Sequence, residues 1–237
     1  MRPDGIRGVV LDLDDTLTDL AGFEPKVWDQ LAKLVGERFP GVDREELRRR
    51  YVDAMEHNYQ RVLDGELDMR GYRRARLAHA VAPWGELGDD DFEDYYRVMR
   101  RTIDEVPVKE GAYEVLRALR EGGYRLAILT NGPSELQRGK LDRFGFAPYV
   151  DAIAISGEIG AAKPDARAYA AVEEMLGIPA AELVMVGDNW EWDIAGALDA
   201  GLAAAYYVGR EDPPPEREGV YRLDSVADLP AALGLAA

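Results

Sequence analysis

The chain of 237 residues contains no cysteine, which excludes disulfide bonds, thiolate metal sites and a cysteine nucleophile. Long apolar runs are absent as well, because the longest one, Leu202 to Val208, is far too short to cross a membrane. Residues 1–10 lack the layout of a secretion signal. We therefore expect a cytoplasmic protein without a membrane partner.

Positive charge is scarce in this sequence. Lysine and arginine together number 29 against 45 aspartates and glutamates, so the formal net charge is −16. Nucleic acids are bound by basic surfaces, and this balance predicts no nucleic-acid partner. An anionic substrate would need a local positive pocket in so acidic a protein. The oligomeric state is not decided by any feature of the sequence.

Continuous apolar runs predict strands that are buried on both faces, as in a parallel sheet. They are Gly8–Leu13, Tyr124–Thr130, Asp151–Ser156, Leu183–Gly187 and Leu202–Val208. Helical spacing of apolar residues follows or separates the later runs, over Glu110–Glu121, Ser134–Phe144, Asp165–Leu176 and Trp190–Ala200. The alternation of strands and helices predicts a doubly wound α/β domain with a parallel sheet.

One long interval, residues 18–107, breaks this alternation. It is strongly charged and carries apolar stripes at helical spacing, such as Val27, Leu31 and Val35, with no strand signal. The sequence therefore predicts an all-α domain over 18–107, inserted into an α/β domain that is formed by residues 1–17 and 108–237.

Polar side chains gather where four of the predicted strands end. They are Asp12 and Asp14 after the first strand, Thr130 and Asn131 after the second, Lys163 after the third, and Asp188 and Asp193 after the fourth. Open parallel sheets bind ligands beyond the carboxyl ends of their strands. We therefore expect these side chains to meet at one edge of the sheet.

This set of residues predicts phosphoryl transfer. Carboxylates without cysteine or histidine ligands suit a hard cation such as Mg²⁺, which would let Asp12 and Asp188 coexist. One carboxylate can attack phosphorus to give an aspartyl-phosphate, and a second can exchange protons with the leaving group and with water. Thr130 with the amides that follow it could bind phosphoryl oxygens, and Lys163 could offset developing negative charge.

Four motifs, in order along nearly the whole chain, resemble those of the haloacid dehalogenase-like (HAD) hydrolase superfamily. They are Asp12-Leu13-Asp14-Asp15-Thr16 after an apolar strand, a strand that ends in Thr130, Lys163 followed by proline, and Gly187-Asp188 with Asp193 downstream. The resemblance implies a Rossmann-like core with a small helical cap domain between the first and second motifs.

The resemblance also implies a role for each motif residue. Asp12 is expected to be the nucleophile and a metal ligand, and Asp14 the general acid/base with its backbone carbonyl on the metal. Asp188 is expected to be a second metal carboxylate, and Asp193 an orienting or water-mediated metal contact. Thr130 and Asn131 are expected to bind phosphate, and Lys163 to be a catalytic and phosphate-binding cation. The implied cofactor is Mg²⁺.

The presence of Asp14 favours one branch of the superfamily. Its dehalogenases lack this acid, because cleavage of a carbon–halogen bond needs no protonated leaving alkoxide. We therefore expect a phosphatase that acts on a small phosphorylated metabolite, a nucleotide or a sugar phosphate. Two alternatives stay open: a phosphosugar mutase of the same superfamily, and a non-catalytic binding protein on the same scaffold.

Overall fold

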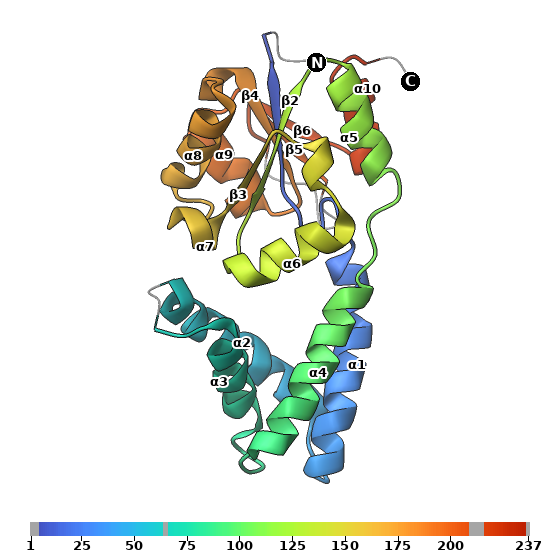
Figure 1. Cartoon of the computed structure of the whole chain (residues 1–237), viewed down its shortest axis with the longest axis vertical. Helices are drawn as coiled ribbons and strands as arrows, with labels where there is room; N and C mark the ends of the chain where they lie inside the picture. The colour runs from blue at the N-terminus through green and yellow to red at the C-terminus, as the bar shows by residue number, and fades with distance from the viewer. Residues whose placement is uncertain (1–4, 64–65, 209–215, 236–237) are drawn as a thin grey trace. The chain divides into compact units, whose positions relative to one another are not determined.

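The computed structural model describes residues 5–63, 66–208 and 216–235. The chain divides into two compact units (Figure 1). The first, called the α/β unit here, consists of Met1–Leu20 and Pro107–Ala237, and the second, called the helical unit, of Ala21–Val106. None of the described helices is long and apolar enough to cross a membrane.

The α/β unit contains a six-stranded parallel sheet in the order β3-β2-β1-β4-β5-β6. The strands are β1 (Gly8–Leu11), β2 (Arg125–Thr130), β3 (Ala152–Ile155), β4 (Leu183–Gly187), β5 (Ala204–Tyr207) and β6 (Val220–Arg222). The doubly wound α/β fold and all five predicted strands are confirmed. The sequence missed β6, because this edge strand is only three residues long and none of them is fully buried.

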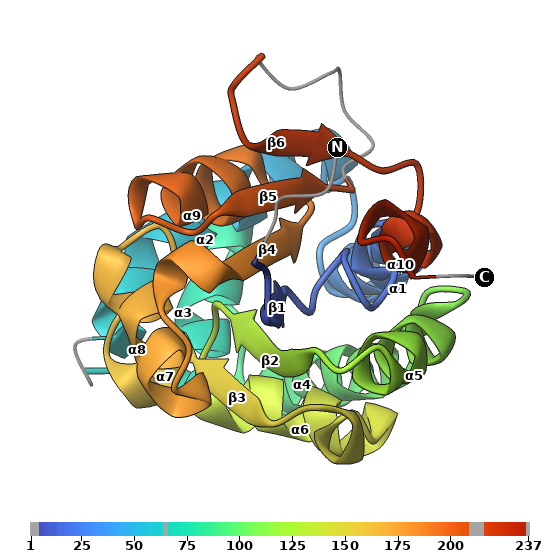
Figure 2. The same cartoon turned by 90° about the horizontal axis from the view of Figure 1, so that it is seen from above.

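Helices cover both faces of the sheet, with α8 (Ala166–Leu176) and α9 (Gly196–Asp199) on one side and α5 (Ala112–Glu121) and α10 (Leu229–Ala232) on the other (Figure 2). This double cover explains why β1 is buried along its whole length. Val10 and Met185, for example, pack into one apolar cluster with Val172 of α8. Two further helices, α6 (Ser134–Phe144) and α7 (Ser156–Ile159), follow β2 and β3.

The helix predicted over Trp190–Ala200 is a wide π-helical turn, Trp190–Ala195, followed by the short α9. The backbone N–H of Trp192 donates to the side-chain oxygen of Asn189, which caps the start of this turn. A π turn adds a residue to each turn of backbone and so redirects a side chain. Here the turn carries Asp193, whose side chain is buried against the end of β4.

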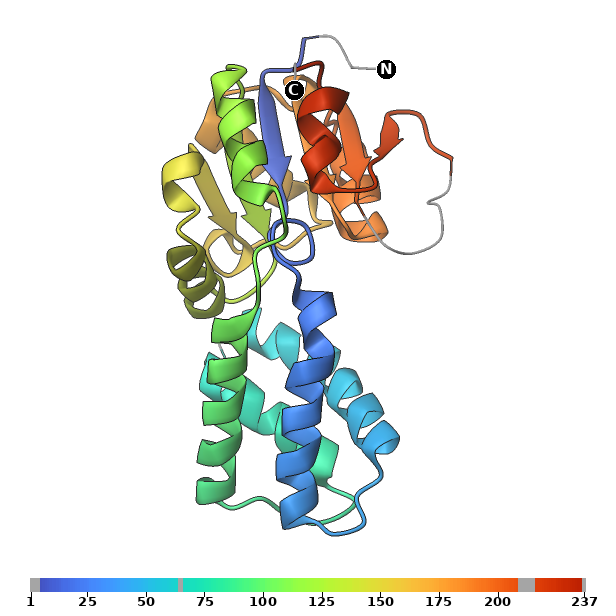
Figure 3. The same cartoon turned by 90° about the vertical axis from the view of Figure 1, so that its right-hand side faces the viewer.

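Within its described residues, the helical unit contains four helices, α1 (Leu20–Arg38), α2 (Arg44–Leu63), α3 (Met69–Val81) and α4 (Asp89–Glu105), which can be followed by colour in Figure 3. Their apolar faces share a core that includes Leu31, Leu47 and Leu77. The hydroxyl groups of Tyr51 and Tyr95 lie 2.6 Å apart inside it, so each buried tyrosine keeps a hydrogen-bond partner.

The two connections between the units are paired inside the α/β unit. Thr18 and Val108 form an isolated antiparallel bridge, and the backbone N–H of Lys109 donates to the carbonyl of Leu17 at 2.9 Å. The chain therefore leaves and re-enters the α/β unit through two segments that are hydrogen-bonded to each other.

Candidate active site

The register of the sheet brings the first, second and fourth motifs together. Leu11 of β1 lies between Ile128 of β2 and Val186 of β4. The residues that follow these strands therefore share one edge of the sheet, as predicted. The backbone N–H of Asp12 extends the pairing by donating to the carbonyl of Val186 at 2.9 Å, which fixes the start of the first-motif loop.

Lys163 links two of the predicted carboxylates. Its Nζ donates to Oδ1 of Asp12 and to Oδ1 of Asp193, each at 2.6 Å. All three side chains are more than nine-tenths buried. Burial alone would lower the pKa of Lys163, but the two carboxylates outweigh burial and raise it, so the ammonium keeps its charge.

Asn131 holds the backbone of Lys163. Its side-chain Oδ1 accepts the Lys163 N–H at 2.8 Å, and its Nδ2 donates to the Lys163 carbonyl at 2.9 Å. The Asn131 Oδ1 and one hydrogen of its Nδ2 are thus engaged with Lys163, and the second Nδ2 hydrogen is the part of the side chain that could donate to phosphate. The phosphate-binding role of Asn131 stays a prediction.

Asp12, Asp188 and Asp193 form an acidic cluster in which one oxygen of each lies within 4.8 Å of the others. Burial raises the pKa of Asp12 well above its ordinary value; the Lys163 ammonium opposes this shift, and the two neighbouring carboxylates add to it. Burial, helped by nearby carboxylates, raises the pKa of Asp188 to about 7. Lys163 alone therefore does not offset the cost of ionising all three carboxylates, and in the absence of another cation the cluster favours bound protons.

This donor set fits a divalent cation such as Mg²⁺. The three carboxyl groups outnumber the one ammonium, so a bound cation could take the place of the protons that they hold, and the ligands are oxygen atoms, as hard cations prefer. Asp193, expected to orient the site or to contact the metal through water, has an oxygen within 4.8 Å of those of Asp12 and Asp188, and its Oδ1 accepts from Lys163, so its role at a metal stays a prediction. Its Oδ2 also accepts the backbone N–H of Asn189 at 3.0 Å, which holds the carboxylate in place.

Asp14 lies outside this cluster and has partners of its own. Its Oδ2 accepts hydrogen bonds from Nζ of Lys140 at 2.6 Å and from Nε2 of Gln137 at 3.1 Å. Gln137 also donates to Oγ1 of Thr130, which connects the second motif to Asp14. Asp12 and Asp14 of the first motif therefore have different surroundings, as distinct chemical roles require.

The sequence analysis missed Gln137 and Lys140. Both lie on the buried face of α6, together with Leu141 and Phe144. The spacing of 137, 141 and 144 is the spacing of one helical face, so a polar residue at 137 stands where an apolar one is expected. This polar residue at an apolar position of the helical face was the signal in the sequence that could have identified Gln137.

Asp15 occupies the turn after Asp14, with a φ of 63°. Aspartate is one of the few residues that adopt this left-handed conformation readily. Lys109, from the second connection between the units, donates a hydrogen bond to the carbonyl of Asp15. This contact ties the first-motif loop to the point where the chain re-enters the α/β unit.

Gly187 leaves no room for a side chain. A Cβ there would lie 2.3 Å from Cβ, Cγ and Oδ2 of Asp193. We expect Gly187→Ala to lower the free energy of unfolding by about 1–3 kcal/mol, because Asp193 must move away from Lys163.

Gly139→Ala is the matched control, because its Cβ would meet nothing within 4 Å. Since position 139 lies inside α6, this change should raise the free energy of unfolding by about 0.5–1 kcal/mol. Urea denaturation measures both, and equal effects would contradict the clash.

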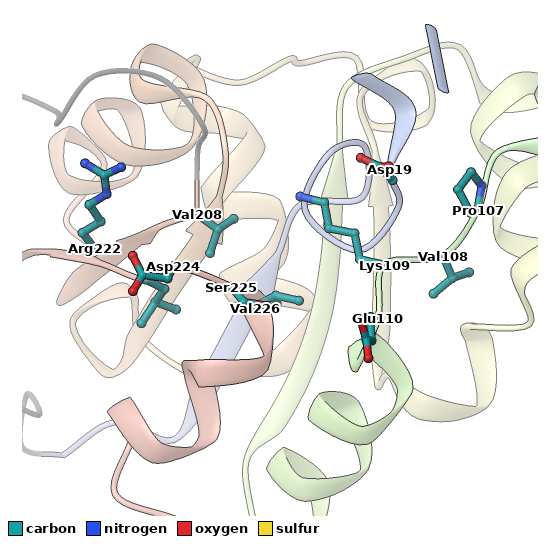
Figure 4. A pocket seen from close by; sticks show the side chains of 11 residues that line it. Asp19, Pro107, Val108, Lys109, Glu110, Val208, Arg222, Asp224, Ser225 and Val226 are labelled. Atoms are coloured by element: carbon teal, nitrogen blue, oxygen red, sulfur yellow. The ribbon is translucent and has the colours of Figure 1, made fainter. Parts of the chain in front are cut away.

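The α/β unit also contains a cavity of about 680 Å³, shown in Figure 4. It is lined by Asp19, Val208 and residues 107–110 and 222–226. Its described lining includes none of the strand-end aspartates, but it does include Lys109, which donates to the Asp15 carbonyl in the first-motif loop.

Comparison with known proteins agrees with the motifs. Residues 6–201 match the haloacid dehalogenase-like hydrolase family. N-acylneuraminate-9-phosphatase of Rattus norvegicus is 27% identical over 96% of this chain and 94% of its own length. Phosphoserine phosphatase of Thermus thermophilus is 30% identical over 84% of this chain and 87% of its own length.

A solved structure shares the fold along the whole chain. The HAD hydrolase YfnB of Bacillus subtilis superposes with a TM-score of 0.72 and 22% sequence identity. The match covers 99% of this chain and 100% of that one. The family and the fold expected from the four motifs are thus confirmed.

Proposed function

Because the chain belongs to the haloacid dehalogenase-like hydrolases, we propose that it is a Mg²⁺-dependent phosphatase of small phosphorylated metabolites. The proposed reaction passes through an aspartyl-phosphate on Asp12. Mg²⁺ would be held by the carboxylates of Asp12 and Asp188 and by the backbone carbonyl of Asp14, and Asp193 lies beside the two carboxylates. The ion would supply positive charge to the phosphoryl oxygens. We also propose that residues 18–107 form the cap domain on which substrate selection depends.

In the first step, Asp12 attacks phosphorus. Its Oδ1 accepts from Lys163, which leaves Oδ2 available to form the new bond. The bond from phosphorus to the leaving oxygen breaks, and Asp14 gives its proton to that oxygen. Lys163 keeps its charge throughout, and it offsets the negative charge that develops on the phosphoryl group.

In the second step, Asp14 takes a proton from water, and the water oxygen attacks the phosphorus of the aspartyl-phosphate. The bond between phosphorus and Asp12 breaks, inorganic phosphate leaves, and both aspartates return to their starting states. Thr130 binds phosphoryl oxygen in both steps. Its Oγ1 already accepts from Gln137, so its own hydroxyl hydrogen remains to be donated to the phosphate.

The observation that carries the proposal is the separation of the two aspartates. Asp12 lies with Lys163 in the acidic cluster, whereas Asp14 is held outside it by Lys140 and Gln137. A nucleophile and a separate acid are what cleavage of a phosphate ester needs, and a dehalogenase has no use for the second. Both named relatives carry phosphatase names, one for a sugar acid phosphate and one for phosphoserine.

Release of inorganic phosphate tests the proposed function. With Mg²⁺ present, we expect the purified protein to release phosphate from at least one member of a panel of nucleotides and sugar phosphates, and EDTA should abolish the release because the acidic cluster then lacks its cation. Readdition of Mg²⁺ in excess is the control.

If the protein converted a hexose 1-phosphate to an isomeric hexose phosphate without releasing inorganic phosphate, the phosphosugar mutase would be supported and the phosphatase contradicted. Failure to process any ester in the panel would favour the non-catalytic alternative.

A further inference from the structure

We propose that Lys140 and Gln137 are positioning residues that present one particular oxygen of Asp14, Oδ1, to the leaving group. This inference rests on the proposed function, since it assigns atoms within the same reaction. It concerns two residues that lie outside the four motifs.

The two carboxylate oxygens of Asp14 differ in their hydrogen-bond partners. Oδ2 accepts hydrogen bonds from the Lys140 ammonium at 2.6 Å and the Gln137 amide at 3.1 Å. Oδ1 is buried and has no hydrogen-bond partner within the described part of the chain. Buried carboxylate oxygens are rarely left without a partner, because the loss of solvation is costly. The unpartnered Oδ1 therefore indicates a partner that arrives with the substrate.

The chemistry of the donors gives the same assignment. An ammonium has only hydrogens to offer, and the Nε2 side of a glutamine amide likewise donates only. A proton on Oδ2 would point at one of these two donors. The proton that Asp14 gives to the leaving oxygen, and later takes from water, is therefore exchanged at Oδ1.

Gln137 also fixes its own orientation. Its Nε2 shares hydrogens among Asp14, Oγ1 of Thr130 and the carbonyl of Asn131, while its Oε1 has no partner among the described residues. Turning the amide over would put Oε1 against two of these acceptors, the Asp14 carboxylate and the Asn131 carbonyl, and break both bonds. One side chain thus aligns the acid with the phosphate-binding threonine.

The helix α6 makes this arrangement rigid. Gln137 and Lys140 are 1% and 7% exposed, although both are polar, and they share the buried face of α6 with Leu141 and Phe144. The packed apolar residues fix the helix, and the helix fixes the two donors. A long side chain such as lysine loses much rotational freedom when it is buried, and the contact with Asp14 offsets that cost.

Dependence on the leaving group tests the inference. Lys140→Met should lower kcat/KM for an alkyl phosphate, whose alkoxide must be protonated as it leaves, by about 10–100-fold. For 4-nitrophenyl phosphate, whose leaving group departs as a stable anion, the loss should stay below about 3-fold. The ratio kcat/KM reports the phosphorylation step alone, so the later hydrolysis of the aspartyl-phosphate does not obscure the comparison. Lys140→Arg, which keeps the charge and the donors, should recover part of the alkyl activity.

Arg138→Met is the matched control, since Arg138 lies on the exposed face of the same helix and pairs with Glu158. It should leave both esters unaffected. Gln137→Leu supplies a second test that keeps Lys140; because it also removes the hydrogen bond to Thr130, it should lower kcat/KM for both esters, with the larger loss on the alkyl ester. Equal losses on the two esters, or no loss in either variant, would overturn the positioning role while leaving the phosphatase intact. A wild-type protein that releases phosphate from neither ester and from no member of the panel of nucleotides and sugar phosphates would overturn the proposed function itself.

Discussion

Asp12→Asn is expected to abolish phosphate release, with a fall in kcat of about 10⁴-fold or more. The amide keeps the shape of the side chain and its hydrogen bond to Lys163, but it cannot attack phosphorus to form the covalent intermediate. Stopped-assay measurement of inorganic phosphate on the best substrate of the panel gives the result. Acid-quenched wild-type enzyme should also carry phosphate on the protein, and the variant should carry none.

The same variant should fold at least as well as the wild type without Mg²⁺. Burial raises the pKa of Asp12, which means that the folded state disfavours the ionised form. For such a group stability declines as pH rises above the unfolded pKa, so at pH 7 the charged aspartate lowers stability and a neutral asparagine does not. A melting temperature at or above the wild-type value would therefore separate lost chemistry from lost structure.

Asp15→Asn is the matched control for this experiment. It removes the same charge three positions away, and asparagine accepts the left-handed conformation of Asp15. We expect it to keep activity within a few-fold of the wild type. If Asp12→Asn released phosphate at a rate comparable to that of Asp15→Asn, Asp12 would not be the nucleophile, and an aspartyl-phosphate on Asp12 would be ruled out.

The sheet could be predicted from sequence because its strands are buried on both faces and therefore read as unbroken apolar runs. The edge strand β6 was missed because it lacks this burial: Val220 and Tyr221 are half-buried and Arg222 is exposed. Ends of elements were less certain: β1 stops at Leu11, two residues before the predicted end, because the first-motif loop turns there. The fold class thus followed from burial, whereas the boundaries depended on local hydrogen bonds.

The candidate site shows a similar division. Motif order identified Asp12, Lys163 and Asp193, but it contained no distances, and the ammonium that bridges Asp12 and Asp193 became visible only in three dimensions. The position of the Asp193 side chain beside Asp12 and Asp188 depends on the π turn after β4, which periodicity cannot distinguish from an ordinary helix start. Gln137 and Lys140 belong to no motif and join the site only through the fold.

Lys163→Met is expected to be the most destabilising single change in the site, lowering the free energy of unfolding by about 3–5 kcal/mol at pH 8. The ammonium is 2% exposed, and it touches Asp12 and Asp193, whose side chains are 9% and 2% exposed. Its removal leaves two carboxylates close together in a buried space without their cation. Urea denaturation without divalent ions measures the loss, and Lys33→Met, the same change at an exposed position of α1, should alter stability by less than about 0.5 kcal/mol.

The pH dependence shows whether buried charge is the cause. Without Lys163 the pKa of Asp12, already raised by burial, rises further because the opposing ammonium is gone, so protons neutralise this carboxylate more fully at pH 5 than at pH 8. The difference in unfolding free energy between wild type and Lys163→Met should therefore shrink as pH falls. Adding Asp193→Asn to Lys163→Met removes one of the two stranded charges and should restore part of the loss at pH 8. A loss that is the same at both pH values and unchanged in the double variant would mean that Lys163 acts by packing its methylene chain, with its ion pairs contributing little to stability.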